Sequence, residues 1–573
     1  MNKIDPINRV ISNFSKYKIA GYLISSKDEY QSEYTSENTN RIKFLTGFSG
    51  SFAIAIIFET QGIFFTDGRY IQQAKQEIDT NFFTIVNISD ITNFDFSPYV
   101  KDGATGYNPK LFTKEFLRYF SSLKLLSIEE NLIDNIWTNR PKASDTQYYL
   151  YNEEYAGLSF QEKIIITRNQ KGRHNYLLIT NSESVCWLLN IRGADQEFCP
   201  IVSSYALISD DEILIFANVA KVSSDIIDHF SPIVSFIDIN VIQDYLLKIT
   251  QEILVDKNTI SEYFASCLKN ANVQYKSDII LKIRAEKTDA EINWAIQRHI
   301  EDAVALCECF AYLDNLLSSN QVISEYELSL KLTHFRKQSP NYISDSFANI
   351  CGYNENSAII HYRPTLESSK IINSNGMLLI DSGGHYLGAT TDVTRTLCLS
   401  DSTKEQRLHY TLVLKGHIAI AKAVFAVGTS GANLDILARQ YLWNYGLDYG
   451  HGTGHGVGNC LNVHEGPHAI SRINNVPLKP NMIVSNEPGY YIPGHYGIRI
   501  ENLCFVTKSR HEGFVEFENL TLMPFEPKLI DKDLLTREET EYIKQYYREI
   551  EAKISPLLSY EAKKWLINQL QLF

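Results

Sequence analysis

The sequence predicts a protein of mixed α/β and α+β class, with two similar α/β domains followed by a larger third domain. The 573 residues are too many for one hydrophobic core. The first two blocks repeat one order of short helix, glycine and two strands, and the third opens with a long amphipathic helix. We expect the domains to span residues 1–150, 151–286 and 287–573.

The composition is that of an ordinary globular enzyme of the reducing cytoplasm. Hydrophobic residues make up 44% and charged residues 21% of the chain, and the net charge is −13. An acidic chain without lysine or arginine tracts is a poor partner for nucleic acids or anionic membranes. The N-terminus lacks the apolar core of a signal peptide, and no apolar run is long enough for a membrane helix. The nine scattered cysteines, all after residue 185, do not resemble a disulfide framework.

The first block alternates strands and helices. The branched and aromatic runs at 53–58 and 62–66 are typical of β-strands, and 74–78 and 114–119 are expected to be helical. A polar, tyrosine-rich stretch at 141–157 is a natural boundary. The second block opens with the apolar runs 163–167 and 176–180, and ends near a strand at 252–256.

The second block echoes the first. Arg41-Ile-Lys-Phe-Leu-Thr-Gly precedes the runs at 53–58 and 62–66, and Val185-Cys-Trp-Leu-Leu-Asn-Ile-Arg-Gly precedes Ser204-Tyr-Ala-Leu-Ile and Glu212-Ile-Leu-Ile-Phe-Ala. Both series indicate a short helix, a glycine stop and two paired strands. The repeat predicts two copies of one α/β unit.

The third block begins with a clear helix. Thr288 and Glu291 form a capping box, and apolar residues then recur at helical spacing as far as Leu313. Further helices are expected at 404–426, at 434–443, and from a second capping box at Thr536 to about residue 556. The Cys-x-Cys at 307–309 lies in the first of these helices without a second pair, so buried helix residues are its interpretation.

Four carboxylates in the third block occupy matching positions. Asp381 ends a buried strand before a glycine turn, and Asp392 precedes another strand eleven residues later. Glu487 and Glu501 repeat the pattern fourteen residues apart. Each alone could be a surface acid or a turn cap. Together, two facing hairpins would bring four negative charges to one place, and divalent cations are their natural partners.

Histidines supply the remaining candidates. His451 and His455 lie in a glycine-rich segment that does not fit a dinucleotide-binding loop and would let ligands approach a cluster closely. His464 and His468 match H-E-x-x-H, but the Gly466-Pro467 between them breaks the helix which that zinc motif requires. His361, expected at the end of another strand, completes the set.

The combined residue types predict a two-metal hydrolase. Carboxylate oxygens with one imidazole suit a pair of ions such as Mn²⁺, Zn²⁺ or Co²⁺. Two such ions, about 3.5–4 Å apart, can share a hydroxide and polarise a carbonyl, which is a way to hydrolyse an amide. We expect two divalent ions, with Mn²⁺ as the first choice.

At these residues the chain resembles the pita-bread metallopeptidases, and more closely the cytosolic three-domain Xaa-Pro aminopeptidases. The resemblance covers nearly the whole chain and extends to Thr46-Gly-Phe-Ser-Gly-Ser, Phe65-Thr-Asp-Gly-Arg-Tyr and Trp187-Leu-Leu-Asn-Ile-Arg-Gly. The strings around the carboxylates and histidines are Asp381-Ser-Gly-Gly, Thr391-Asp-Val-Thr-Arg-Thr, His451-Gly-Thr-Gly-His-Gly-Val-Gly, Asn462-Val-His-Glu-Gly-Pro, Asn486-Glu-Pro-Gly-Tyr-Tyr and Arg499-Ile-Glu-Asn.

The resemblance implies two creatinase-like N-terminal α/β domains, a C-terminal pita-bread catalytic domain, a homodimer, and cleavage between an N-terminal residue and a following proline. It implies that His361 and His464 contact substrate and help to move protons, with His451 nearby. We further expect Glu487 to act as the general base, so the candidate catalytic residues are His361, His451, His464 and Glu487. It also implies that Arg69, from the first domain, reaches the bound peptide. With Arg499 added, the candidate substrate-binding residues are Arg69, His361, His464 and Arg499. The implied metal ligands are Asp381, Asp392, His455, Glu487 and Glu501.

Two departures and two alternatives accompany the resemblance. Phe52-Ala-Ile-Ala replaces a small-residue run of the family, and His468 stands at a position that is usually small and uncharged; both could alter the substrate rim. A prolidase, which cuts Xaa-Pro dipeptides, would use the same metal set. A non-catalytic peptide-binding module of this fold would have lost ligands, and all five are present here.

Overall fold

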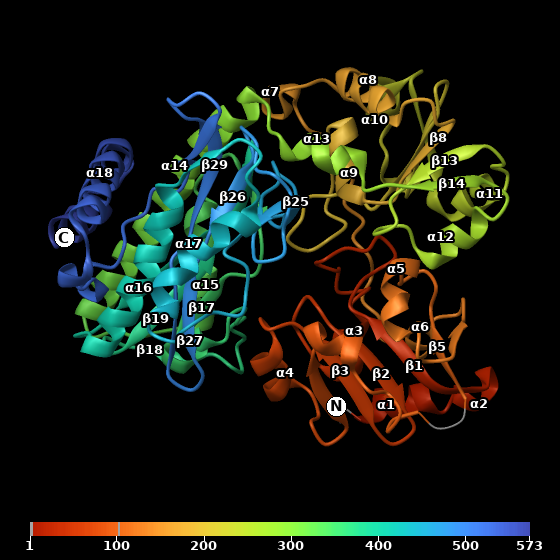
Figure 1. Ribbon diagram of the computed structural model, residues 1–573, viewed down its shortest axis with the longest axis horizontal. Coiled ribbons are helices and arrows are strands. Elements are labelled where there is room, and N and C mark those ends of the chain that lie inside the picture. The colour runs from red at the N-terminus through yellow and green to blue at the C-terminus, as the bar shows by residue number, and fades with distance from the viewer. Residues whose placement is uncertain (1–3, 101–102) are drawn as a thin grey trace. The chain divides into compact units, whose positions relative to one another are not determined.

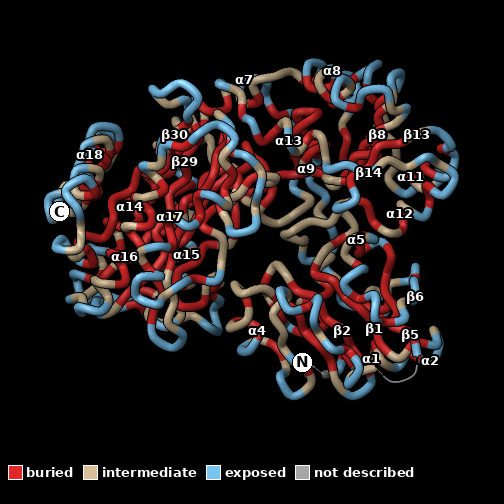
Figure 2. The backbone as a smooth tube through the Cα atoms, viewed as in Figure 1, coloured by how far each residue is buried: buried red, intermediate tan, exposed pale blue. Residues whose placement is uncertain are grey.

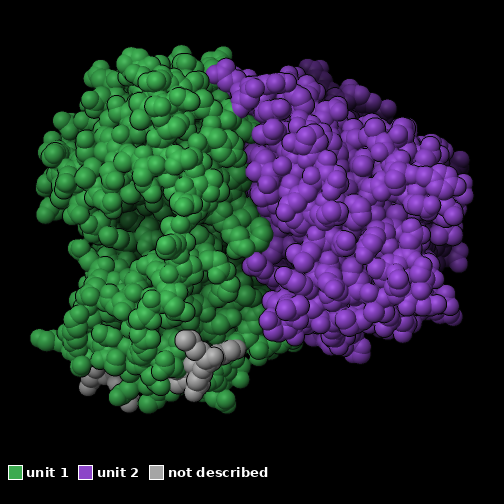
Figure 3. Space-filling view, turned by 180° about the vertical axis from the view of Figure 1, so that it is seen from behind, with its two compact units in different colours: residues 1–151, 159–280 green, residues 152–158, 281–573 purple. Residues whose placement is uncertain are grey.

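The structure is a computed structural model that describes residues 4–100 and 103–573. The chain divides into two compact units (Figure 3). The first unit contains residues 1–151 and 159–280, and the second contains residues 152–158 and 281–573.

The first unit holds two six-stranded sheets (Figure 1). The strands of one are β1 (Ile19–Ser25), β2 (Ile54–Phe58), β3 (Gly62–Thr66), β4 (Phe83–Asn87), β5 (Ala104–Tyr107) and β6 (Leu125–Ser127). Those of the other are β8 (Tyr176–Ile179), β10 (Tyr205–Ile208), β11 (Ile213–Ala217), β12 (Val234–Asp238), β13 (Glu252–Val255) and β14 (Asn272–Tyr275).

The two sheets share one topology, which is the repeat expected from the sequence. Their orders are β4-β3-β2-β1-β5-β6 and β12-β11-β10-β8-β13-β14. In each, the three central strands pair antiparallel and the outer strands add in parallel. Two separate sheets support the prediction of two α/β domains, although both lie in one compact unit.

Helices of the first unit connect and cover these strands. One detail of the repeat differs from the prediction: α3 ends at Gly47 with φ 79°, but α9 ends at Asn190 with φ 50°, not at Gly193. Asparagine tolerates the left-handed conformation and can replace glycine at this stop. The helices are α1 (Ile4–Ile11), α2 (Phe14–Tyr17), α3 (Arg41–Thr46), α4 (Ile71–Glu77), α5 (Lys114–Leu117), α6 (Leu132–Ile136), α8 (Phe160–Lys171), α9 (Ser182–Leu189), α10 (Ser224–Phe230), α11 (Ile242–Leu246) and α12 (Glu262–Cys267).

The second unit packs long helices against antiparallel strands around one large core. Cys307, Leu328, Leu378, Leu412 and Ile543 belong to this core, and each comes from a different element. Figure 2 shows the buried strands and the exposed outer turns of the helices. The helices are α7 (Glu153–Ala156), α14 (Asp289–Ser318), α15 (Glu325–Arg336), α16 (Lys404–Ala421), α17 (Gly431–Trp443), α18 (Arg537–Ile554) and α19 (Tyr560–Gln571), and α13 (Ile279–Ala285) carries the chain between the units.

Two sheets of the second unit carry the candidate site. The first is β17-β19-β22, formed by Ile350–Tyr353, Met377–Ser382 and Val393–Cys398. The second runs in the order β23-β30-β29-β26-β24-β25. Its strands are β23 (Val424–Ala426), β24 (Gly454–Gly456), β25 (Glu465–Ile470), β26 (Ile483–Asn486), β29 (Asn502–Lys508) and β30 (Phe514–Asn519).

One predicted helix is shorter than expected. The helix expected at 404–426 ends at Ala421, because Val424–Ala426 forms an edge strand that pairs with β30 and packs Phe425 onto Phe517. The apolar run 163–167 lies inside α8, behind a Ser159–Glu162 capping box. Both capping boxes named from the sequence are present, at the starts of α14 and α18.

Other expectations concern buried and apolar residues. Cys307 and Cys309 are fully buried in α14, as predicted, and all nine cysteines are free thiols. Across the described ranges, no helix is long and apolar enough to cross a membrane. Residues 152–158 pack with the second unit, where Trp294 Nε1 donates to the Glu154 carbonyl oxygen.

Candidate metal centre

The two aspartates lie side by side on paired strands. β19 and β22 are antiparallel with Asp381 opposite Thr394, and Asp392 directly precedes β22. Two short strands, β20 (Gly384–Tyr386) and β21 (Ala389–Thr390), lie between them in the chain. Both carboxylates are buried. The pairing is the hairpin expected from the sequence, with an inserted pair of strands.

The two glutamates meet in the same way on the second sheet. β26 pairs with β29 so that Asn486 lies opposite Asn502. Glu487 directly follows β26 and Glu501 directly precedes β29, so both glutamates lie next to this last pair of the ladder. The intervening segment forms a hairpin of β27 (Gly489–Ile492) and β28 (Tyr496–Arg499). This second pairing also matches the predicted pattern of strand, carboxylate, turn and strand.

His455 lies in the middle of β24 and faces the carboxylates. Its Nδ1–H donates to the Gly456 carbonyl oxygen at 2.9 Å, which leaves Nε2 as the lone-pair nitrogen. Nε2 lies 3.5 Å from Asp392 Oδ2 and 3.6 Å from Glu487 Oε1. The tautomer is therefore the one that a metal ligand needs.

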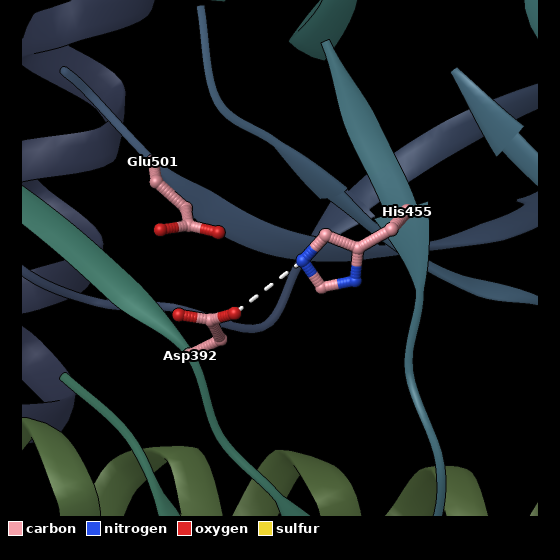
Figure 4. Close-up of side chains that lie close together, drawn as sticks. All are labelled: Asp392, His455 and Glu501. Carbon is pink, nitrogen blue, oxygen red and sulfur yellow. Dashed lines mark ion pairs between the residues drawn. The ribbon is translucent and has the colours of Figure 1, made fainter. Parts of the chain in front are cut away.

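The ligand atoms converge on one point (Figure 4). One atom each from Asp392, His455 and Glu501 lie within 4.8 Å of one another. Ser485 links the group, since its hydroxyl donates to Glu487 Oε1 at 3.0 Å and accepts the His455 backbone N–H at 2.9 Å. Arg499 donates to Asp381 Oδ2 at 2.5 Å. Glu487 lies beside this group, with Oε1 3.6 Å from His455 Nε2, and Asp381 lies beside Asp392. Asp381, Asp392 and Glu501 are buried, whereas His455 and Glu487 are partly exposed.

The charges of this cluster favour divalent cations. Burial first, and then the neighbouring carboxylates, raise the pKa values of Asp392 and Glu501 well above the usual range. Burial acts on Glu487 in the same direction, but His455 and His451 outweigh it and lower its pKa. Four carboxylates at this spacing repel one another strongly when ionised, so divalent cations would stabilise them.

Two buried carboxylate oxygens without a hydrogen-bond donor also indicate that cations fit this cluster. Asp381 Oδ1 and Asp392 Oδ1 are buried and accept no hydrogen bond from the described residues. A buried carboxylate oxygen without a donor is costly unless an ion binds it. The donor set, four carboxylates and one correctly oriented imidazole, suits Mn²⁺, Zn²⁺ or Co²⁺.

Glu501 is held by residues that the sequence analysis did not single out. The Thr394 hydroxyl donates to Glu501 Oε2 at 2.6 Å. Arg395 is buried and gives hydrogen bonds to the carbonyl oxygens of Glu501 and Thr394 and to Asn502 Oδ1. These bonds fix the backbone beside the ligand. The Thr-Arg pair was visible in the sequence string but had no spacing signal of its own.

A hydrogen-bond chain joins the cluster to His451. Arg499 Nη1 donates to the Tyr491 hydroxyl at 2.8 Å, and that hydroxyl lies 2.9 Å from His451 Nε2. His451 Nδ1 is 2.7 Å from the Gly452 carbonyl oxygen, so the neutral ring accepts from Tyr491. Burial lowers the pKa of His451 to about 4. Tyr491 was missed because a tyrosine in a strand ordinarily indicates packing alone.

His464 directly precedes Glu465, a buried carboxylate that two cationic side chains hold in place. Glu465, the first residue of β25, is buried and pairs with Arg284 at 2.7 Å and with Lys287. The His464 ring lies 4.4 Å from that of His455, edge to face. Residues 465–470 form a strand, so the H-E-x-x-H match is no zinc helix, as predicted. His468 is buried and bonds to the Ile483 carbonyl oxygen instead.

The remaining two predicted substrate residues occupy different units. His361 lies in the second unit, where its ring stacks on that of His464 at 6.4 Å and 18°. It does not end a strand as expected, because residues 354–358 form a 3-10 helix and a turn follows in which the Tyr362 N–H donates to the Ile359 carbonyl oxygen. Arg69 lies in the first unit, where Asp67 accepts from Arg69 Nε at 3.0 Å and from Nη2 at 2.8 Å. Glu33 lies 3.8 Å from Arg69 Nη1. The role of Arg69 toward a peptide stays a prediction.

Known proteins are similar to this chain along its whole length. Residues 285–508 match metallopeptidase family M24, and residues 513–573 match the C-terminal region of peptidase M24. Residues 6–131 and 139–291 each match a Creatinase/Prolidase N-terminal domain. A probable Xaa-Pro aminopeptidase P from Laccaria bicolor is 34% identical and covers 99% of this chain and 93% of its own. The chain belongs to metallopeptidase family M24.

Further M24 relatives agree in sequence and structure. Xaa-Pro aminopeptidase ApepP of Drosophila melanogaster is 33% identical, with 96% of this chain and 95% of the relative covered. The crystal structure of X-prolyl aminopeptidase from Caenorhabditis elegans, described as a cytosolic enzyme with a di-nuclear active site, matches with a TM-score of 0.95. It is 31% identical and covers 100% of both chains.

These similarities test the predicted family and fold class. The resemblance to Xaa-Pro aminopeptidases is confirmed over nearly the full chain. The predicted creatinase-like N-terminal domains and pita-bread metallopeptidase domain are confirmed as well. The domain limits and the roles of individual residues remain predictions.

Proposed function

We propose that this M24 metallopeptidase is an Xaa-Pro aminopeptidase, which hydrolyses the bond between an N-terminal residue and a following proline. The observation that carries the proposal is the convergence of Asp392, His455 and Glu501 on one point within a chain similar to such enzymes along its full length. A proline nitrogen has no hydrogen to donate, so a peptidase for this bond needs a dedicated site.

The proposed cofactors are two divalent ions, with Mn²⁺ as the first choice. Two ions held by this cluster would share a hydroxide as the nucleophile and polarise the carbonyl before proline. The proposed ligands are Asp381, Asp392, His455, Glu487 and Glu501.

The chain's own groups have separable proposed tasks. Glu487 accepts the proton of the nucleophile as a carboxylate whose Oε1 lies 3.6 Å from His455 Nε2. His361 and His464, with stacked rings, stabilise the oxyanion and donate to the departing proline nitrogen. His451 accepts a hydrogen bond from the Tyr491 hydroxyl. Tyr491 in turn accepts from Arg499 and so orients the Arg499 guanidinium against Asp381. Arg499 and, from the first unit, Arg69 contact the peptide.

The decisive experiment compares two substrates. The protein is stripped with chelator and restored with Mn²⁺, Zn²⁺ or Co²⁺, and release of the first residue is measured from Xaa-Pro and from Xaa-Pro-Yaa. We expect hydrolysis of the tripeptide only after an ion is restored. Cleavage confined to the dipeptide would instead identify a prolidase, and binding without cleavage would identify a peptide-binding module.

The cellular setting and assembly belong to the same proposal. We propose a cytoplasmic homodimer acting on peptides with proline in second position. Nine buried free thiols are compatible with a reducing compartment. Light scattering measures the assembly: twice the mass of one 65.5 kDa chain is expected, and the mass of a single chain would remove the dimer from the proposal.

A further inference from the structure

The loop that carries His361 is attached to a single buried carboxylate. The loop covers residues 354–370 between β17 (Ile350–Tyr353) and β18 (Ile371–Ile372). Glu325, the first residue of α15, has no exposed surface and faces this loop. A loop of this length gains little order from its own sequence, so its attachments decide where His361 lies.

Glu325 receives hydrogen bonds from the start, the middle and the end of the loop. Asn356 Nδ2 donates to both carboxylate oxygens at 3.0 Å, and the Tyr362 hydroxyl donates to Oε2 at 2.8 Å. The backbone N–H groups of Tyr353 and Lys370 donate at 2.6 Å and 2.8 Å. One side chain therefore ties together the end of β17 at Tyr353 and three points of the loop, at Asn356, Tyr362 and Lys370.

Every one of these donors is uncharged. Burial raises the pKa of Glu325, while the hydrogen bonds oppose that shift. The start of α15 also favours a negative charge, because its free backbone N–H groups carry partial positive charge. A buried carboxylate whose hydrogen-bond donors are all neutral costs free energy that packing alone would not require. Its hydrogen bonds also fix the direction of each donor.

His361 lies between two of the attached residues. The Tyr362 backbone N–H donates to the Ile359 carbonyl oxygen at 3.0 Å, which closes a turn with His361 next to Tyr362. Ile359 and Tyr362 are both buried, so the turn cannot rotate without losing their contacts. On its other side the loop reaches β28, where the Gly497 N–H donates to Ser357 Oγ at 2.7 Å.

We propose that Glu325 is a positioning residue that holds His361 in place through Tyr362 and Asn356. It does not touch the substrate. Its carboxylate sets the angle at which the His361 ring faces His464 and the reacting bond. A displacement of about 1 Å at such a group can lower the rate by about 100-fold, so this attachment affects catalysis without making a contact of its own. The proposal rests on the proposed function of His361.

The test is a double-mutant cycle between Tyr362→Phe and His361→Ala, with kcat and KM measured on Xaa-Pro-Yaa in Mn²⁺-loaded protein. Tyr362→Phe removes one hydroxyl and keeps the buried ring. We expect it to lower kcat/KM about tenfold in the native background and less than about twofold when His361 is already absent. Equal losses in both backgrounds would overturn the proposal, because the hydroxyl would then act independently of His361.

A matched control and a second variant complete the design. Tyr547, in α18, also donates one buried hydroxyl hydrogen bond, to the Phe525 carbonyl oxygen at 3.1 Å, and Tyr547→Phe removes it. This variant should leave kcat/KM within about twofold in both backgrounds. Glu325→Gln places an amide N–H₂ against the loop's donors and should give a larger loss than Tyr362→Phe. A smaller loss would count against Glu325 as the anchor.

Hydrogen exchange keeps the test independent of activity. In Tyr362→Phe, the amides of residues 354–370 should exchange at least about tenfold faster at unchanged metal content. Unchanged exchange would overturn the anchoring role even if activity fell. If the native protein cleaved no Xaa-Pro-Yaa peptide, the proposed function would fail, while the exchange result would still decide whether Glu325 anchors the loop.

Discussion

At the residue scale, three of the proposed ligands have a neighbour that fixes them. The Gly456 carbonyl sets the tautomer of His455, the Thr394 hydroxyl orients Glu501, and Arg499 neutralises Asp381. Removing a ligand and removing one of these neighbours should therefore have different effects. Loss of a ligand changes metal content, whereas loss of a neighbour changes turnover at constant metal content.

The first prediction concerns a ligand. Asp392→Asn removes one negative charge and one strong oxygen donor at the centre of the cluster. We expect fewer than two ions per chain and a fall in kcat of about 1000-fold or more. Elemental analysis and turnover measure both, with the exposed Asp401→Asn as control. Full activity in Asp392→Asn would remove this residue from the ligand set.

The second prediction concerns the hydrogen-bond chain. Tyr491→Phe separates Arg499 from His451 and leaves two ions bound, because Tyr491 is no ligand. We expect kcat/KM to fall about tenfold, the size of a lost hydrogen bond to a charged group. The neighbouring Tyr490→Phe is the control. If both variants behaved alike, the chain through Tyr491 would have no part in the reaction.

At the element scale, the sheets carry the ligands and buried ion pairs hold the sheets. Glu465 at the start of β25 is clamped by Arg284 and Lys287, which lie in α13 and just after it. All three residues are buried. Removal of one partner leaves an uncompensated charge inside the protein, so this clamp governs how firmly the strand after His464 is held.

The third prediction tests that clamp. Glu465→Gln should lower the free energy of unfolding by about 3–5 kcal/mol, as for other broken buried pairs. The exposed pair of Glu286 and Lys479 is a matched control from the same region. Glu286→Gln should change the free energy by less than about 1 kcal/mol. Similar losses in denaturant titrations of both variants would contradict the special role of the buried pair.

The sequence predicted strands and ligands well where local patterns are strong. Asp381 and Glu487 follow apolar runs and precede glycine, and the structure places them at strand ends. Ion-pair partners that lie far apart in the sequence could not be predicted. Arg284 lies 181 residues from Glu465, and no local pattern joins them. The helix expected through 426 ended early because pairing with β30 outweighed the local preference of 424–426.

At the scale of the whole molecule, metal binding and stability are linked. Asp392 and Glu501 are buried in the second unit, and the carboxylates around them repel one another without cations. Ions that bind only the folded chain add to its stability. The metal-free protein is therefore expected to be less stable, and its stability should depend on pH.

The fourth prediction follows from the sign of the pKa shifts. Folding raises the pKa values of Asp392 and Glu501 in the metal-free chain, so the folded state binds more protons than the unfolded state. The free energy of unfolding should then fall as the pH rises through the ordinary carboxylate range toward the raised values. Urea titrations at pH 5 and pH 8 measure this. Bound Mn²⁺ should reverse the loss, and equal stability of the metal-free protein at both values would contradict the account.

The central claim is that two ions in this cluster perform the cleavage. A stepwise titration of chelator-treated protein with Mn²⁺, followed by elemental analysis and assay on Xaa-Pro-Yaa at each step, tests it most directly. We expect activity to be absent without metal and to reach its full value at two ions per chain, with Asp392→Asn inactive throughout. Undiminished cleavage by the metal-free protein, or none with two ions bound, would contradict the claim.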